Sequence, residues 1–275
     1  MLDGLRATTI ALGLLLAAVP TCAQPIPPPA KPAEEELQND SDPTKSVFLS
    51  VRNEYFNLSD DAWINVLVIR SDRVLLRKHR RLGGKLGILT RFDLPVVTAH
   101  FDGTTQTGLG DLYAQALYVP WLTPGFALAM GSGMAFPTAT ARSLGMGKWR
   151  VAPLVAPVWF FPERKGYFLV RLHQFVSFAG PSDRRDTNYL LTAPTLLYRF
   201  HPRWWIVLDT EMKTDWEQDN HASFRSGLQI GYFVTPLFAI AIKPEVPWGG
   251  HREAAPSIPG NWALKLTITR HRRRN

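Results

Sequence analysis

Apolar and polar residues alternate with a period of two along most of the chain, and no segment keeps a helical period for long. The pattern is clearest in the last third, where Ile206 and Leu208 alternate with Asp209 and Glu211. Such alternation predicts strands with one apolar and one polar face. The polar faces carry too many charges to lie in the dry interior of a β-sandwich.

The alternation recurs in segments between residues 46 and 270, so the chain is predicted to be all-β. Each segment is long enough for a tilted strand to cross a bilayer, which takes about 9 to 11 residues. The segments number about twelve, and an even number of strands is typical of outer-membrane barrels. The predicted strands span residues 46–57, 62–76, 85–97, 109–119, 125–136, 148–160, 167–178, 188–200, 203–214, 223–233, 237–246 and 261–270.

The links between these segments alternate between long polar stretches and short turns that contain proline. A membrane barrel shows this order because one rim faces the exterior and the other faces the periplasm. Backbone groups in hydrocarbon have no water to bind, so the sheet must close on itself. The sequence therefore predicts a transmembrane antiparallel up-and-down β-barrel of about twelve strands over residues 46–270. The long links are expected at residues 58–62, 98–108, 137–147, 179–187, 215–223 and 247–261.

The residues before the barrel indicate export. Arg6 precedes an apolar run that is too short to span a bilayer as a helix, and a cleavage site follows at Ala23, so residues 1–23 are predicted to be a signal peptide. Lipidation of Cys22 is the minor alternative. Residues 24–45 are proline-rich and then acidic, which predicts a disordered periplasmic leader. Cleavage would remove the chain's one cysteine, so burial and backbone pairing must supply the stability.

The formal net charge of the 275-residue chain is +8, which raises the question of a nucleic-acid partner. The densest basic runs are residues 77–81, at a predicted turn, and residues 270–274, at the chain end. Neither forms a helix face or a platform interleaved with aromatic residues. The sequence therefore predicts no nucleic-acid binding, and residues 271–275 are predicted to be a solvated basic tail.

A glycine-rich stretch at residues 136–149, FPTATARSLGMGKW, has some features of a phosphate-binding loop. Such a loop needs Ser or Thr after its lysine and should open a helix, but Trp149 follows Lys148. The next residues include Pro153 and Pro157, which do not fit a helix. Nucleotide binding is therefore set aside, and no cofactor is expected.

Several short motifs resemble an outer-membrane barrel family labelled Putative MetA-pathway of phenol degradation. They are GLGD at 108–111, PTAT at 137–140, LGMGKW at 144–149, TDW at 214–216 and NW at 261–262. The resemblance implies similarity to transport barrels for hydrophobic compounds, with no catalytic residues assigned. It also implies an exterior loop that carries the motif residues Pro137, Thr138, Thr140, Gly145, Gly147, Lys148 and Trp149. The chain departs from such barrels at its end, which reads RHRRRN where an aromatic residue that helps assembly is usual.

The polar faces of the last four predicted strands are expected to line the lumen. They carry four acids and four bases, which would form either a selective charged constriction or a salt-bridged filling. A barrel of this size lies between filled eight-stranded barrels and open sixteen-stranded ones, and this favours the filling. The candidates are Asp209, Glu211, Lys213, Asp215, Arg225, Gln229, Lys243, Glu245 and Lys265.

Catalytic and metal-binding chemistry has little support in the sequence. His173 and Ser177 share one face of a strand but are about 13 Å apart, too far for a nucleophile and its base. The histidines show no paired spacing typical of a metal site. The chain is therefore expected not to be an enzyme and to bind no metal.

These observations predict a passive channel or transporter for small molecules, with aromatic or other hydrophobic solutes implied by the resemblance alone. A lipid-modifying barrel enzyme and a structural or receptor barrel with a filled lumen are the alternatives. The expected location is the bacterial outer membrane. The expected partners are outer-membrane lipids, lipopolysaccharide and the barrel-assembly machinery.

Overall fold

A computed structural model of the protein describes residues 48–75, 88–250 and 261–271. The predicted signal peptide at 1–23, the leader at 24–45 and the basic turn at 77–81 lie outside the described residues. Most of the predicted link at 247–261 and residues 272–275 also lie outside them.

The described residues form thirteen β-strands and two short 3₁₀ turns. The strands are β1 (Phe48–Ser59), β2 (Ala62–Leu75), β3 (Ile88–Phe101), β4 (Thr104–Leu109), β5 (Leu112–Leu122), β6 (Phe126–Phe136), β7 (Trp149–Phe160), β8 (Gly166–Ala179), β9 (Asn188–His201), β10 (Trp204–Asp215), β11 (His221–Thr235), β12 (Phe238–Gly250) and β13 (Trp262–His271). The 3₁₀ turns are η1 (Arg142–Leu144) and η2 (Pro162–Arg164).

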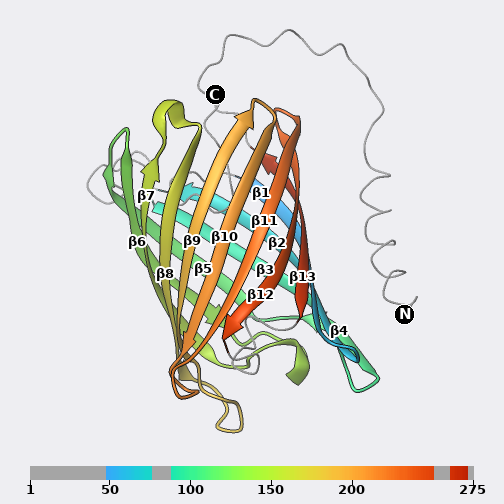
Figure 1. The fold of residues 1–275 in the computed structure, drawn as a ribbon. Coiled ribbons are helices and arrows are strands. Elements are labelled where there is room, and N and C mark those ends of the chain that lie inside the picture. Colours follow the sequence, from blue (N-terminus) through green and yellow to red (C-terminus); the bar gives the residue numbers. More distant parts are fainter. Residues whose placement is uncertain (1–47, 76–87, 251–260, 272–275) are drawn as a thin grey trace. The chain divides into compact units, whose positions relative to one another are not determined.

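The strands form one closed antiparallel barrel (Figure 1). Apart from β4, the strands pair in chain order, with β3 next to β5, and β1 also pairs with β13, which closes the ring. The wall contains twelve strands because β4 and β5 both pair along β3 and occupy one place in the ring. Within the described residues, β4 pairs with β3 alone. The predicted fold class, an up-and-down barrel of about twelve strands, is confirmed.

The two rims differ in their links. We call the rim with the links 137–148 and 180–187 the loop rim. The opposite rim, where β1 begins at Phe48 and β13 ends at His271, is the terminal rim and faces the top of Figure 1. Short turns join β5 to β6, β9 to β10 and β11 to β12 at the terminal rim.

Three of the links predicted to be long are short in the structure, so these predictions are wrong. Only Asp60 and Asp61 separate β1 from β2. The expected link at 98–108 is instead a hairpin, in which β3 continues to Phe101 and β4 returns after the pair Asp102–Gly103. Both turn residues have positive φ, 49° and 74°, as a type I′ turn requires.

The third wrong prediction arises like the second, because strands continue through polar residues that were predicted to form a link. The expected link at 215–223 shortens to the turn at 216–220, because β10 and β11 extend further than expected. Polar residues do not end a strand where it leaves the hydrocarbon, since water can then solvate them. Within the described residues, two of the links expected to be long remain so, at 137–148 and 180–187.

The last strand ends one residue beyond the predicted limit at 270. His271 pairs with Phe48 across the closing seam, and its ring centroid lies 6.2 Å from that of Phe48 and 5.6 Å from that of Phe233. It therefore belongs to the wall rather than to the basic tail.

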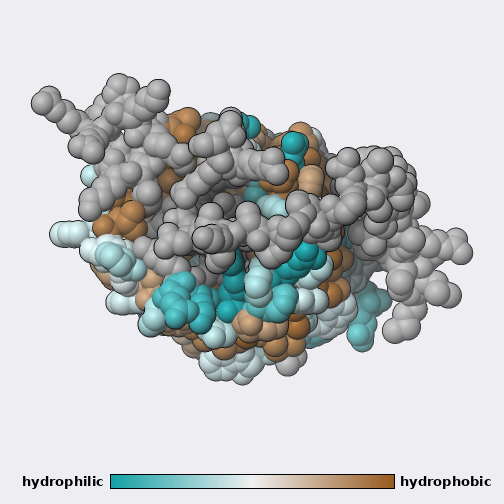
Figure 2. Space-filling model, turned by 90° about the horizontal axis from the view of Figure 1, so that it is seen from above, coloured by the Kyte–Doolittle hydropathy of each residue, from teal (hydrophilic) through white to brown (hydrophobic). Residues whose placement is uncertain are grey.

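The two faces of the wall have opposite character. Outward side chains are apolar and exposed, as for Leu208 at 49% and Ile240 at 47%. Charged side chains on the inner face are buried, including Lys213 and Arg225 at 2% each. Figure 2 views the terminal rim, with hydrophobic residues along the outer side of the wall. A soluble protein shows the reverse arrangement, so the outer face suits a lipid environment.

Tryptophans mark both rims on the outer face. One set lies at strand ends near the loop rim and the other near the terminal rim, as the aromatic girdles of membrane barrels do. Trp63, Trp149, Trp216, Trp248 and Trp262 form the first set, and Trp121, Trp159 and Trp204 form the second. In the part of the chain that is described, no helix is long and apolar enough to cross a membrane.

A charge on the outer face is expected to destabilise the barrel according to its depth. Leu208→Arg, near the middle of β10, should lower the free energy of unfolding in lipid vesicles by about 2–4 kcal/mol. Thr214→Arg, on the same face close to the loop rim, should cost only about 0–1 kcal/mol. Urea titrations of the refolded variants would measure both. Equal costs at the two positions would contradict a lipid-facing wall.

Candidate functional site

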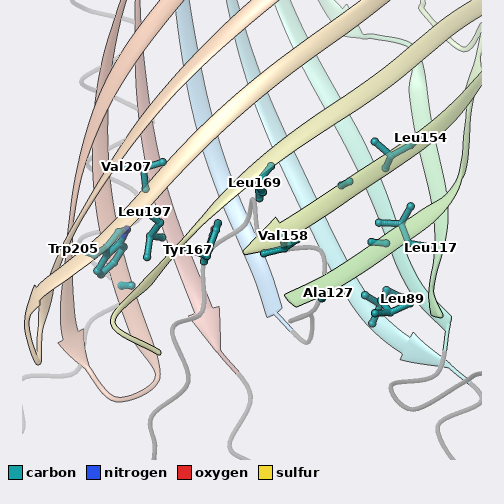
Figure 3. Close-up of a cluster of buried hydrophobic side chains, with 14 residues drawn as sticks. Leu89, Leu117, Ala127, Leu154, Val158, Tyr167, Leu169, Leu197, Trp205 and Val207 are labelled. Atoms are coloured by element: carbon teal, nitrogen blue, oxygen red, sulfur yellow. The ribbon is translucent and has the colours of Figure 1, made fainter. Parts of the chain in front are cut away.

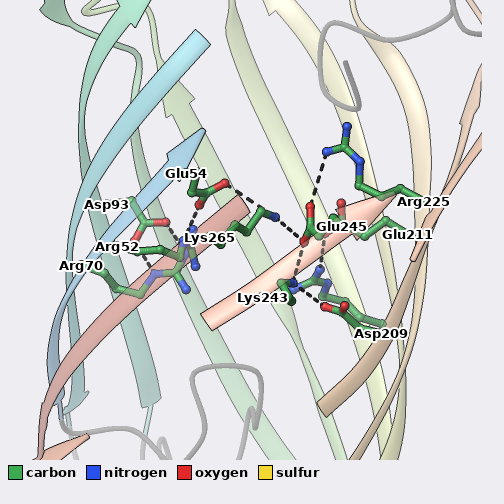
Figure 4. Close-up of polar contacts among 11 residues, drawn as sticks. Arg52, Glu54, Arg70, Asp93, Asp209, Glu211, Arg225, Lys243, Glu245 and Lys265 are labelled. Atoms are coloured by element: carbon green, nitrogen blue, oxygen red, sulfur yellow. Dashed lines mark hydrogen bonds and ion pairs between the residues drawn. The ribbon is translucent and has the colours of Figure 1, made fainter. Parts of the chain in front are cut away.

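The lumen is the candidate site, and an ion-pair ladder runs along one part of its wall (Figure 4). Lys265 Nζ lies 2.8 Å from Glu245 Oε1 and 3.6 Å from Glu54 Oε2. Lys243 Nζ lies 2.7 Å from Glu245 Oε1 and 2.8 Å from Asp209 Oδ2. Because these residues come from β1, β13, β12 and β10, the ladder follows the circumference of the barrel.

Two further ion pairs join this ladder, one from Arg225 on β11 and one from Arg52 on β1. Arg225 Nη1 lies 3.5 Å from Glu245 Oε2, and its guanidinium lies 5.4 Å from the centre of the Phe56 ring. Arg52 is paired with Glu54 on the same strand. The ladder therefore reaches from β10 to β1.

A second group of ion pairs joins β2 and β3. Arg70 donates to both oxygens of Asp93, at 2.7 and 2.8 Å, and Arg91 donates to both oxygens of Asp72, at 3.0 Å each. Bidentate pairs of this kind are strong and directional. Cross-strand neighbours supply them, since Arg70 is opposite Asp93 and Asp72 is opposite Arg91.

The remaining lumen candidates lie on the same inner face. Glu211 is 3.8 Å from Arg171, and Lys213 is 3.0 Å from Asp215. Gln229 is half-buried on β11. The charges on this part of the wall are therefore paired with neighbours, in the arrangement of a salt-bridged lining.

Sequence reasoning missed the charged residues of the first three strands. Arg52 and Glu54 share a face, as do Arg70 with Asp72 and Arg91 with Asp93. Each pair has the i, i+2 spacing that places two side chains on one face of a strand. This spacing of charged residues could therefore have been used to predict that they face the lumen.

An aromatic strip lies on another part of the inner wall, across β5, β8 and β9. The ring centroids of His173 and Phe175 are 4.2 Å apart, and those of Phe175 and Tyr189 are 4.8 Å apart. The Tyr113 hydroxyl lies 3.1 Å from His173 Nε2. Lys213 Nζ lies 4.4 Å from the centre of the Tyr189 ring, a cation–π contact.

Small residues on the inner face of β6 leave room for the Tyr113 side chain. A Cβ on Gly133 would fall 2.0 Å from the Tyr113 hydroxyl, so only glycine lets this tyrosine cross β6 toward His173. All the inner-face positions of β6 are small: Ala127, Ala129, Gly131, Gly133 and Ala135.

An apolar layer lines the lumen towards the terminal rim (Figure 3). Tyr167, Leu197 and Trp205 are buried there among aliphatic side chains from β3, β5, β7 and β8. A Cβ on Gly231 would fall 2.1 Å from the Trp205 ring, so this glycine makes room for the indole. The layer consists of Leu89, Leu117, Val119, Ala127, Ala129, Leu154, Ala156, Val158, Tyr167, Leu169, Leu197, Trp205, Val207 and Ala239.

His173 and Ser177 have separate partners. His173 contacts Tyr113, whereas the Ser177 hydroxyl donates to Asp186 Oδ1 at 3.2 Å and accepts from the backbone N–H of Thr187 at 2.9 Å. The structure does not bring the two together as a nucleophile and its base. Among the described residues, no group of three or more His, Cys, Asp or Glu could hold a metal ion.

The glycine-rich link at residues 137–148, here called the motif loop, folds against the inner face at the loop rim. Its Leu144 is only 4% exposed and packs against Val97 and Ala99, with Ile64 and Val66 beside them. These four residues belong to the inner face of β2 and β3. The motif loop therefore lies within the mouth of the barrel.

The family motifs interlock at the base of this loop. The Thr138 hydroxyl donates to the carbonyl of Gly110 and accepts from the N–H of Leu112, both at 2.9 Å. The N–H of Thr140 donates to the carbonyl of Leu109 at 3.0 Å. A Cβ on Gly108 would fall 2.1 Å from the Thr140 hydroxyl. The PTAT motif is therefore hydrogen-bonded to the GLGD motif and to Leu112, which follows it.

The other motif residues place the ends of the loop. Pro137 follows the last residue of β6, and Trp149 begins β7 with its ring centroid 5.4 Å from that of Phe136. Gly147 has a φ of 69°, which favours glycine. A Cβ on Gly145 would fall 2.6 Å from an oxygen of Asp111.

Residues 180–187 form a latch over the motif loop. Lys148 Nζ lies 2.9 Å from Asp186 Oδ1, and Arg142 is paired with Asp183. Arg184 Nη1 donates to the carbonyl of Arg142 at 2.8 Å. The two loops are therefore held together at the loop rim.

Acid is expected to release this latch. Hydrogen bonds from Arg142 to Asp183 and from Lys148 to Asp186 hold the pKa of each carboxyl below its usual value. The stability this gives is complete above the unfolded pKa, about 4, and is lost as the pH falls through the lower folded pKa. A spin label at Ser143→Cys should therefore become more mobile between about pH 5 and pH 2.

The control for this measurement removes the titrating groups. In an Asp183→Asn/Asp186→Asn background, the label should already be mobile at about pH 5 and should stay mobile down to about pH 2. A label at Ser59→Cys, on the same rim, should not respond to pH. An immobile label on Ser143→Cys at low pH would contradict the latch.

Comparison with known proteins gives a family and a fold. A family model described as Putative MetA-pathway of phenol degradation matches residues 79–246. The comparison with curated proteins finds no match.

Three solved structures are similar to the chain. An outer membrane channel from Pseudomonas putida F1 has a TM-score of 0.63 and 16% identity, over 88% of this chain and 99% of that one. The NanC porin has a TM-score of 0.56 and 14% identity, over 80% and 97%. The KdgM porin has a TM-score of 0.54 and 10% identity, over 82% and 100%. At these identities the likeness shows the fold alone.

Proposed function

We propose, because the chain belongs to the family described as Putative MetA-pathway of phenol degradation, that its barrel is a passive channel for small molecules. The likeness to outer-membrane channel and porin barrels supports this proposal. The apolar outer wall and its two tryptophan belts support a place in the bacterial outer membrane. There the partners would be outer-membrane lipids and lipopolysaccharide, after insertion by the barrel-assembly machinery.

We further propose small aromatic or other hydrophobic compounds as the solutes. The observation that carries this is the succession of an aromatic strip and an apolar layer along the lumen. An apolar constriction opposes the passage of hydrated ions because water is expelled from it. Aromatic faces attract rings through apolar burial and stacking. The ionic groups of the lumen are largely engaged with one another and so offer less to a charged solute.

Two other functions are less well supported. A lipid-modifying enzyme would need a nucleophile with a base in reach, and His173 and Ser177 have other partners. A receptor or structural barrel with a filled lumen is favoured by one observation, the near-complete burial of the apolar layer. Conductance measurements separate this alternative from a channel.

The aromatic strip is expected to govern the preference for aromatic solutes. In proteoliposome swelling assays, phenyl β-glucoside should enter faster than methyl β-glucoside. Phe175→Ala should lower this ratio by roughly 2- to 10-fold, the worth of one aromatic contact. Phe178→Ala, which changes an outward residue of the same strand, should leave the ratio unchanged. Equal entry of the two glucosides in the unaltered protein would exclude the aromatic preference.

The apolar layer is expected to limit ion flow. Trp205→Ala removes a buried indole from the layer and should raise single-channel conductance in planar bilayers by roughly twofold or more. Trp204→Ala is the matched control, because the adjacent indole is exposed on the outer face. If neither the unaltered protein nor Trp205→Ala conducts, the filled-lumen alternative is favoured.

A further inference from the structure

We propose that Asp111 is the positioning residue that holds the motif loop inside the mouth of the barrel, so that the loop sets the width of the entrance. The part of the inference that concerns the entrance rests on the proposed channel function. The part that concerns the loop stands on geometry alone.

The carboxylate of Asp111 ties both ends of the motif loop to the wall. Its Oδ2 accepts hydrogen bonds from the backbone N–H groups of Met146, at 2.8 Å, and Gly147, at 3.3 Å. Its Oδ1 accepts from the N–H of Ala139 at 3.3 Å. Arg150 Nη2 lies 3.7 Å from Oδ2, and the Asp111 side chain is only 6% exposed.

The break between β4 and β5 brings this carboxylate to the loop. Gly110 lies at the break, and its N–H donates to the carbonyl of Pro95 at 2.9 Å. A Cβ on Gly110 would fall 2.8 Å from the Val97 side chain and 3.2 Å from the carbonyl oxygen of Leu144. The wall strand is therefore interrupted where the motif loop needs space and an anionic anchor.

A carboxylate is better suited to this position than an amide. Asp111 meets only donors among these contacts: three backbone N–H groups and the guanidinium of Arg150. An asparagine would offer one acceptor oxygen and would turn its NH₂ toward some of these donors. A buried N–H without an acceptor is strongly unfavourable, so the loop should leave the wall.

The first test compares Asp111→Asn with Asp102→Asn. The control residue lies at the exposed turn of the β3–β4 hairpin on the same rim, and asparagine tolerates its positive φ. In Asp111→Asn, amide hydrogen exchange in residues 137–148 should accelerate by roughly tenfold or more, whereas exchange in β3 should not change. Single-channel conductance should rise in the same variant. Asp102→Asn should match the unaltered protein in both measurements.

A disulfide provides the second test. A Cβ on Gly108 would lie 3.4 Å from the Cβ of Thr140, close to the separation of about 3.5–4.5 Å in disulfides. Gly108→Cys/Thr140→Cys, added to Asp111→Asn, should restore low conductance when oxidised and lose it on reduction. A variant that has merely lost its fold would not recover in this way.

The outcomes separate the two claims. Unchanged exchange and unchanged conductance in Asp111→Asn would overturn the inference. Faster exchange in the loop without any conductance, in every variant and in the unaltered protein, would uphold the role of Asp111 and remove the proposed channel function. Faster exchange with unchanged, measurable conductance would show that the loop does not set the entrance.

Discussion

The need to pair every backbone N–H and C=O group away from water is the constraint on which the rest of the structure depends. The pairing of β1 with β13 meets it by leaving the ring without an open seam. Once the backbone is satisfied in this way, the two faces of each strand are free to differ. Leu208 and Asp209 are neighbours in sequence, yet one contacts the surroundings of the barrel and the other contacts Lys243 inside it.

Inside the ring, large side chains lie along the wall rather than across it. Lys265 reaches its partners on adjacent strands, and Tyr113 crosses the glycine-bearing surface of β6 to meet His173. Ionic, aromatic and apolar sectors can then share one lumen. Residues two positions apart on a strand share the inner face, so their size and charge decide whether a sector is ionic, aromatic or apolar.

Alternation along single strands was enough to predict the fold, because the inward and outward sets can be read from local sequence. The hairpin at Asp102–Gly103 was also within reach of the sequence, since Asp-Gly is a strong turn signal. The motif loop and the aromatic strip were not. The contacts of Asp111 with residues 139 and 146, and of Tyr113 with His173, join distant segments, and no local pattern specifies them. The family motifs identified the loop but not the direction in which it folds.

The solitary pairing of β4 has a consequence for how deeply the barrel can sit in a bilayer. One edge of this strand has no neighbouring strand among the described residues. The Leu109 carbonyl accepts from the N–H of Thr140, and the other peptide groups on that edge need water. In a bilayer, the hairpin of β3 and β4 would therefore have to lie outside the acyl chains, where water can reach it. It would thereby limit how deeply the barrel can sit, because below this hairpin each described strand of the ring is paired on both sides.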